Sequence, residues 1–247
     1  MIRIGVDEAG RGPMIGPLVV AAIGIPEQDL EILAENNITD SKKLNPIKRK
    51  LAYELIEKNC NERGWEKYIT ICNPIDIDLA LEISNLNILE TELFAETINN
   101  LDIDKNKGGK MILDACDVNE KRFGNNVSAL ITEWPWNQWE LISIHRADSI
   151  HRIVGAASIV AKFTRDKIIQ DLENETGIKI GSGYPSDSIS KAALHELCKD
   201  DLPSNCLRWN WASIRNYWNE FKGCNPPKRD FTNVKRNSSI QHRLSDY

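Results

Sequence analysis

The stretch Gly5-Val6-Asp7-Glu8-Ala9-Gly10-Arg11-Gly12-Pro13-Met14-Ile15-Gly16 decides how this chain folds and where its chemistry lies. Apolar residues alternate with Arg and Gly along positions 2–6, which is the period-two pattern of a strand half buried on one face. Successive strand side chains point to opposite faces, so Asp7 and Glu8 can reach one site only if the strand ends there. Glycines at 10 and 12 give the backbone the freedom to turn. The stretch therefore predicts a strand that ends in a metal site, although an isolated Asp-Glu pair is more often a solvated turn.

The composition is that of an ordinary soluble globular protein, and the length allows one sizeable core with a small appended region, or two modest domains. The chain has 247 residues, of which 41% are hydrophobic and 27% charged. No apolar run approaches the length of a membrane span, and Met1 leads into the first strand without a signal peptide. Six scattered cysteines form no Cys-x-x-Cys pair, which argues against a zinc set and favours reduced thiols. We therefore expect a cytoplasmic protein with no membrane partner, and a monomer.

The net charge of −5 argues against a nucleic-acid protein, but the charge is unevenly distributed. Residues 222–247 carry six Lys and Arg against two Asp, so the acidic excess lies in the rest of the chain. An acidic body is compatible with a metal-dependent site and leaves room for local basic strips. Net charge alone does not decide the class of partner.

Hydrophobic periodicity predicts a mixed sheet covered by helices. Five segments are expected to be strands: 1–7, 17–25, 67–73, 110–115 and 138–144. Five others have helical spacing: 46–63, 84–101, 150–175, 187–199 and 210–221. Three strands joined in sequence, followed by strands that alternate with helices, indicate an α/β fold with a mixed five-stranded sheet flanked by helices and a C-terminal helical extension.

Two further aspartates follow strands in the same way as the first acidic pair. Asp114 ends the strand expected at 110–115, and Asp148 lies at the start of the long helix after the strand at 138–144. Acids at the carboxyl ends of neighbouring strands can converge at one edge of a sheet. Such a cluster is unfavourable until a hard divalent cation such as Mg²⁺ neutralises it. Taken singly, Asp148 is better explained as a helix N-cap, and Asp117 competes with Asp114 as the ligand.

The glycine loop also resembles a dinucleotide-binding fingerprint. It leads into the strand expected at 17–25 and not into a helix, so the helix N-terminus that would cradle a pyrophosphate is missing. This interpretation is rejected.

Five motifs resemble those of type 2 ribonuclease H, in that family's order. They are Gly-Val-Asp-Glu-Ala-Gly-Arg-Gly-Pro (5–13), Thr-Asp-Ser-Lys-Lys-Leu (39–44), Ile-Leu-Asp-Ala-Cys-Asp (112–117), Ala-Asp…Ala-Ala-Ser-Ile-Val-Ala-Lys (147–162) and Gly-Ser-Gly-Tyr-Pro-Ser-Asp (181–187). The resemblance implies a ribonuclease H-like catalytic domain over 1–175, a C-terminal helical subdomain packed on it over 176–222 and a flexible basic tail over 223–247. It also implies an endoribonuclease for RNA–DNA hybrids that cuts 5′ to a ribonucleotide at RNA–DNA junctions, including single ribonucleotides embedded in DNA.

The resemblance further implies roles for individual residues. Four acids would be catalytic and hold two Mg²⁺ or Mn²⁺ ions: Asp7, Glu8, Asp114 and Asp148. The backbone of Gly10, Arg11 and Gly12, with the hydroxyl of Tyr184, would recognise the ribose 2′-hydroxyl, which distinguishes RNA from DNA. Four residues would contact backbone phosphates: Thr39, Ser41, Lys42 and Lys162. The alternative interpretations are an ordinary loop tyrosine at 184 and solvated surface lysines.

The chain departs from the family pattern after Asp148, where His151-Arg152 stands in place of an aromatic-Pro pair. Loss of the proline is expected to change how the long helix begins. His151 is expected to be a surface or capping residue, since a metal-activated water needs no histidine base. The Gly-Arg-Gly loop and a catalytic strand that begins at residue 2 favour type 2 over the related type 3 enzymes. The motif at 39–44 and the length favour an archaeal single-chain enzyme.

The last residues resemble the peptide that docks on a replication sliding clamp. Gln241, Leu244 and Tyr247 have the Gln-x-x-aliphatic-x-x-aromatic spacing, although a second aromatic residue is absent. The alternative is an unstructured tail whose basic residues bind nucleic acid loosely. For the whole chain, the alternatives are another ribonuclease H-fold nuclease that resembles a junction resolvase, or a catalytically silent hybrid-binding module.

Overall fold

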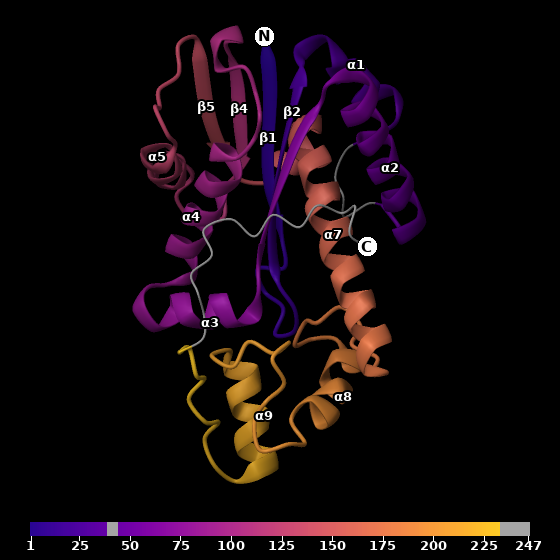
Figure 1. The fold of residues 1–247 in the computed structure, drawn as a ribbon, viewed down its shortest axis with the longest axis vertical. Helices are drawn as coiled ribbons and strands as arrows, with labels where there is room; N and C mark the ends of the chain where they lie inside the picture. The colour runs from indigo at the N-terminus through magenta and orange to yellow at the C-terminus, as the bar shows by residue number, and fades with distance from the viewer. Residues whose placement is uncertain (39–43, 233–247) are drawn as a thin grey trace.

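A five-stranded mixed sheet lies at the centre of the computed structural model, which describes residues 1–38 and 44–232. The strands are β1 (Ile2–Ala9), β2 (Leu18–Pro26), β3 (Glu66–Cys72), β4 (Gly109–Asp114) and β5 (Trp139–Ile144). Their order in the sheet is β3-β2-β1-β4-β5 (Figure 1). β2 is antiparallel to β1 and β3, whereas β4 is parallel to β1 and β5. The predicted fold class is confirmed.

Helices cover both faces of this sheet. Their bounds are α1 (Leu30–Glu35), α2 (Pro46–Arg63), α3 (Pro74–Ile83), α4 (Leu86–Asn99), α5 (Glu120–Leu130), α6 (Ala147–Ile150), α7 (Arg152–Thr176), α8 (Ser188–Leu197) and α9 (Ala212–Lys222). On one face, Val6 packs in a core with Phe94 of α4 and Phe123 of α5. On the other face, Ala21 packs in a second core with Ala157 of α7. The alternating strand residues thus fill two separate cores.

The close approach of α7 to β1 depends on a glycine. A Cβ atom at Gly5 would lie 2.3 Å from the carbonyl oxygen of Ile153, so any larger residue would force the helix away. The small residues Ala156 and Ala157 continue this contact, as both are fully buried on α7. Asp7 lies two residues after Gly5 and on the same face. The packing therefore directs the Asp7 side chain toward the α6–α7 layer.

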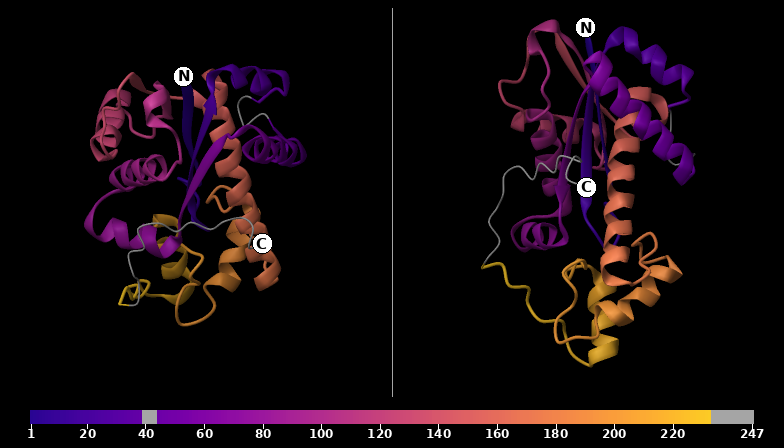
Figure 2. Two further views of the ribbon diagram at one scale, coloured as in Figure 1. Left: turned by 45° about the horizontal axis from the view of Figure 1, so that its top comes forward. Right: turned by 45° about the vertical axis from the view of Figure 1, so that its right-hand side comes forward.

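The C-terminal helices lie beyond the end of α7, at the end of the sheet where β1 finishes (Figures 1 and 2). They enclose a third core that includes Leu194, Leu207 and Trp218. Met14 and Ile15 from the opening glycine-rich stretch are buried in the same core. The loop that follows the first acidic pair is therefore built into the C-terminal helical region.

Packing continues past the expected start of the tail at residue 223. The guanidinium of Arg229 is buried and donates to Asp78 of α3 at 2.7 Å and to the carbonyl oxygen of Leu207 at 2.9 Å. The buried carboxylate of Asp78 thus holds the chain at least as far as Arg229, which lies within the segment 223–247 that was expected to be a flexible tail. Residues 233–247 lie outside the described part. Among the described residues, no helix has both the length and the apolar character needed to cross a bilayer.

Candidate active site

Three aspartates from successive parallel strands meet at the carboxyl edge of the sheet. Asp7 lies near the end of β1, Asp114 is the last residue of β4, and Asp148 lies on α6 just after β5. One carboxylate oxygen of each lies within 4.8 Å of the others. Asp7 is only 4% exposed and Asp148 only 2%. The parallel pairing of β1, β4 and β5 thus concentrates three acids in a mostly buried space.

The electrostatics of this group favour a bound cation. The pKa of Asp7 is raised well above its ordinary value by burial, and further by the charges of Glu8 and Asp114, while a hydrogen bond with Ser158 opposes the shift. A cation among the three carboxylates would offset this repulsion, and hard oxygen donors suit Mg²⁺ or Mn²⁺. The donor set therefore fits a site for divalent metal ions.

Glu8 lies on the opposite face of β1 from Asp7. The strand does not end at the acidic pair but continues to Ala9, which is opposite Val19 of β2. Adjacent side chains therefore point to opposite faces. Glu8 groups with Glu90 of α4 and Cys116, with one ligand atom of each within 4.8 Å of the others, and the Cys116 thiol donates to Glu8 at 3.3 Å. The structure thus brings three of the four predicted acids together and places the fourth in an adjoining group.

Glu90 belongs to this second group and was not identified from the sequence. It is fully buried, and its pKa is raised to about 8 by burial and by the charge of Glu8, with Arg11 opposing the shift. Its carboxylate pairs with the Arg11 guanidinium, which also donates to Asn87 at 2.9 Å. An acid on the core-facing side of a predicted helix, one residue after Leu89, was the available signal. The Arg11 side chain is therefore anchored to α4.

The glycine loop and the loop after α7 lie directly against each other. Gly10 has a φ of +93°, and a Cβ atom there would lie 2.5 Å from the carbonyl oxygen of Pro17. A Cβ atom at Gly12 would lie 3.2 Å from the Tyr184 ring, which is 40% exposed. The carbonyl oxygen of Gly183 accepts from the Met14 amide at 2.8 Å. The structure therefore brings Tyr184 to the loop with which it was grouped.

The remaining predicted residues divide into those placed elsewhere and those not described. Lys162 is half-buried on α7. Asp117 is held by the Arg122 guanidinium at 2.8 Å beside α5, so it does not compete with Asp114. The N-caps of α6 and α7 are Arg146 and His151, so the N-cap interpretation of Asp148 is wrong. Six predicted contact residues lie outside the described residues: Thr39, Ser41, Lys42, Gln241, Leu244 and Tyr247.

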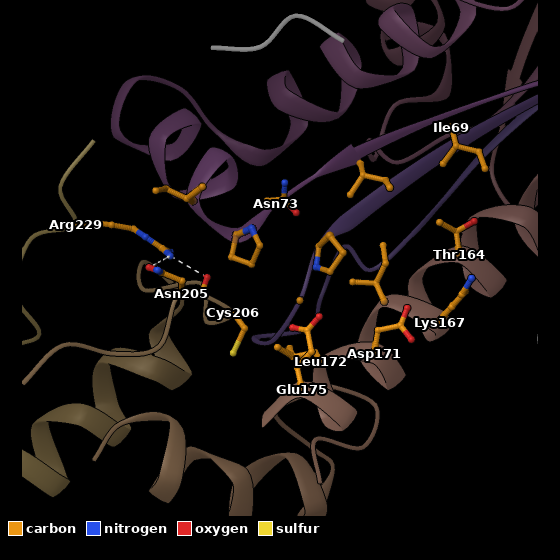
Figure 3. Close-up of a pocket in the computed structure, with 16 residues that line it drawn as sticks. Ile69, Asn73, Thr164, Lys167, Asp171, Leu172, Glu175, Asn205, Cys206 and Arg229 are labelled. Atoms are coloured by element: carbon orange, nitrogen blue, oxygen red, sulfur yellow. Dashed lines mark hydrogen bonds between the residues drawn. The ribbon is translucent and has the colours of Figure 1, made fainter. Parts of the chain in front are cut away.

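A cavity of about 460 Å³ lies between β3, α7 and the C-terminal segment (Figure 3). Its wall is largely apolar, with Ile69 and Leu172 on two sides and Arg229 bonded to Asn205 at one end (Figure 3). The three clustered aspartates are not part of this wall, among the residues that the structure describes. The cavity is therefore separate from the carboxylate site.

Comparisons with known proteins give matches over most of the chain. Residues 4–214 match the family model described as ribonuclease HII. The chain is 40% identical over 223 residues to a ribonuclease HII of Methanococcus maripaludis, covering 90% of this chain and 89% of the relative. The crystal structure of a ribonuclease H2 from Pyrococcus horikoshii is similar with a TM-score of 0.77 and 36% identity, covering 90% of this chain and 99% of that one. The structure of the PCNA:RNase HII complex from Archaeoglobus fulgidus is similar with a TM-score of 0.72 and 29% identity, covering 85% and 95%.

Proposed function

This chain belongs to the ribonuclease HII family and is a ribonuclease H, and we propose that it cuts on the 5′ side of a ribonucleotide at an RNA–DNA junction. Single ribonucleotides embedded in duplex DNA are included among its substrates. The products would be a 3′-hydroxyl and a 5′-phosphate. The observation that carries the proposal is the placement of a carboxylate cluster and a glycine loop at the two ends of one short stretch, residues 7–12.

The carboxylate cluster would perform the hydrolysis. Asp7, Asp114 and Asp148 offer oxygen ligands within 4.8 Å of one another, and Glu8 adjoins them on the next position of β1. These acids would hold two divalent cations, which would supply activation of the attacking water and neutralisation of the leaving oxygen. Burial of Asp7 and Asp148 excludes bulk water from the acids, which strengthens the electrostatic interactions at the reacting phosphate. Either Mg²⁺ or Mn²⁺ suits these ligands.

The glycine loop would choose which phosphodiester is cut. Backbone amides of residues 10–12 would bind the 2′-hydroxyl with the hydroxyl of Tyr184. The exposed Tyr184 ring lies against Gly12, where it can stack on the deoxyribose that follows the ribonucleotide. Because the loop follows Asp7 and Glu8 directly, the recognised hydroxyl would lie next to the bond to be broken.

Contacts outside this centre would position the duplex without reading its sequence. Thr39, Ser41 and Lys42 would bind phosphates together with Lys162 of α7. Residues 241–247 would dock a replication sliding clamp through Gln241, Leu244 and Tyr247. The complex of PCNA with the Archaeoglobus fulgidus relative supports this partner. We propose a monomeric enzyme that acts in the cytoplasm.

The test is a cleavage assay on a DNA duplex with one embedded ribonucleotide, with Mg²⁺, Mn²⁺ or EDTA. Cleavage with either metal and none with EDTA is expected. A four-way DNA junction distinguishes the resolvase-like alternative, because it lacks a 2′-hydroxyl. Cleavage of the junction and not of the ribonucleotide duplex would overturn the proposal. Binding of the duplex without cleavage under any metal would favour the silent hybrid-binding module.

A further inference from the structure

A single arginine from the C-terminal region holds the glycine loop by its carbonyl oxygens. The Arg208 side chain is fully buried and donates to the carbonyl oxygens of Gly10 at 2.5 Å, Arg11 at 3.0 Å and Gly16 at 3.0 Å. The indole N–H of Trp211 donates to the carbonyl oxygen of Gly12 at 3.3 Å. Every carbonyl oxygen from Gly10 to Gly12 is therefore engaged by two residues almost 200 positions later in the chain.

Burial of this charged guanidinium is unfavourable unless other contacts replace its lost hydration. Burial, with a smaller contribution from the charge of Arg165, lowers the pKa of Arg208 to about 9. The guanidinium carbon lies 4.8 Å from the centre of the Trp211 ring, which partly replaces lost hydration through a cation–π interaction. Its hydrogen bonds go to backbone carbonyl oxygens, and the planar fork of arginine can reach several of these at once.

The direction of the carbonyl groups fixes the direction of the amides. In a trans peptide unit the C=O and the following N–H point in opposite directions, and the cis bond found in the described chain is Trp134–Pro135. Because the carbonyls of Gly10 and Arg11 face Arg208, the N–H groups of Arg11 and Gly12 face away from it. Within residues 1–38 and 44–232, these two N–H groups have no hydrogen-bond acceptor.

The rest of the loop is fixed on its other sides. The Arg11 side chain is anchored to Glu90 and Asn87 on α4, which holds the loop on that side. The amide of Gly16 donates to the carbonyl oxygen of Cys206 at 2.9 Å, and the amide of Arg208 donates to the carbonyl oxygen of Met14 at 3.0 Å. These contacts hold the two ends and one side of the loop. Arg208 holds the carbonyl groups between them and so sets the orientation of the two amides.

We propose that Arg208 is a positioning residue that, with Trp211, aims the N–H groups of Arg11 and Gly12 at the ribose 2′-hydroxyl, so that ribonucleotide discrimination depends on the C-terminal segment. The inference rests on the proposed function, in which the glycine loop binds this hydroxyl. Arg208 touches neither the substrate nor the metal ligands. Its effect is confined to the geometry of the loop, which makes it separable from metal binding and phosphate contacts.

A thermodynamic cycle between the arginine and the 2′-hydroxyl tests this role. The dissociation constant is measured in EDTA for a duplex with one ribonucleotide and for the all-DNA duplex of the same sequence. For the wild type, the ribonucleotide duplex should bind about tenfold more tightly, as expected for hydrogen bonds to one hydroxyl. In Arg208→Lys, which keeps the charge but loses the fork, this ratio should fall to about one while all-DNA binding is unchanged. Arg215→Lys, an exposed arginine on α9, is the matched control and should keep the wild-type ratio.

The outcomes separate the proposed recognition of the 2′-hydroxyl from the positioning role of Arg208. A wild-type ratio of one overturns the proposed 2′-hydroxyl reading and this inference with it. A ratio above one that Arg208→Lys preserves overturns the inference alone. An equal loss for both duplexes means a general structural role and also overturns it. If Arg208→Lys does not fold, Trp211→Phe decides, because it removes the indole N–H near Gly12 while keeping an aromatic ring, and it should lower the ratio.

Discussion

Asp7 and Glu8 are neighbours in sequence but lie on opposite faces of β1. Asp7 joins Asp114 and Asp148, whereas Glu8 joins Glu90 and Cys116. The two groups adjoin, since a hydrogen bond joins the Asp7 and Glu8 side chains, and both this bond and the charge of Glu8 help raise the pKa of Asp7. Substitutions at the two positions should therefore have different consequences.

Asp7→Asn should lower kcat by about three orders of magnitude or more, since a lost metal ligand forfeits several kcal/mol of transition-state stabilisation. The same change should not destabilise the metal-free fold. The pKa of Asp7 is higher in the folded than in the unfolded state, so the folded state loses stability as pH rises from the unfolded pKa through the folded pKa. Asparagine does not titrate, so the variant does not lose this stability. Thermal unfolding in EDTA at pH 7 should give the variant an equal or higher Tm. Mg²⁺ should then raise the Tm of the wild type only, and full activity of the variant with Mg²⁺ would contradict the metal role.

Glu8→Gln should weaken metal binding less than Asp7→Asn. The Glu8 carboxylate lies outside the group of three aspartates, so its loss should cost about 10- to 100-fold in affinity, as for residues that support a ligand set. Calorimetric titration with Mn²⁺ measures both variants under one condition. Equal losses in the two variants would show that both acids are direct ligands of equal weight.

Tyr184 substitutions should alter substrate choice more than duplex affinity. Tyr184→Phe keeps the ring against Gly12 and removes only the hydroxyl, so kcat/KM on a single-ribonucleotide duplex should fall by about tenfold. Tyr184→Ala removes the ring as well and should erode the preference for an RNA–DNA junction over a continuous RNA–DNA hybrid. Competition between these two substrates measures the preference directly. An unchanged preference in Tyr184→Ala would exclude the ring from junction recognition.

Asp187 should stabilise the loop that carries Tyr184 in a pH-dependent way. It accepts from the Ser182 amide at 2.7 Å and the Ile189 amide at 3.0 Å, and these bonds lower its pKa to about 2. A lowered pKa gives stability above the unfolded value of 3.8 that is lost as pH falls through the folded value. Asp187→Ala should therefore have a lower Tm than the wild type at pH 7, with the difference shrinking between about pH 4 and pH 2. Asp201→Ala, at an exposed aspartate, is the matched control and should keep the wild-type Tm at pH 7.

The sheet was predictable because its strands have strong local signals. Helices α3 and α5 were not. Along α3, large apolar residues recur at every second position from Ile75 to Ile83, which is the period of a strand, and this pattern competes with the helix start signals at Asn73 and Pro74. Helix α5 contains Gly124 and two asparagines, which are poor helix formers. In both cases tertiary packing outweighs local preference.

The candidate site was predictable in its residue types but not in its geometry. The division of Asp7 from Glu8 depends on whether β1 ends at residue 7 or 9, and strand ends are uncertain by about two residues from sequence. Arg208 carries no periodic signal, because its partners at Gly10 and Gly16 are almost 200 positions away. Contacts of this kind become visible only when the chain is folded.

The claim that residues 7–12 choose one phosphodiester is tested most directly by the position of the cut. A DNA duplex with one ribonucleotide is digested with Mg²⁺ and the products are identified by mass spectrometry. We predict one fragment that ends in a deoxynucleotide 3′-hydroxyl and one that begins with the ribonucleotide bearing a 5′-phosphate. A cut on the 3′ side of the ribonucleotide, a cyclic phosphate product, or equal cleavage of the all-DNA duplex would contradict it.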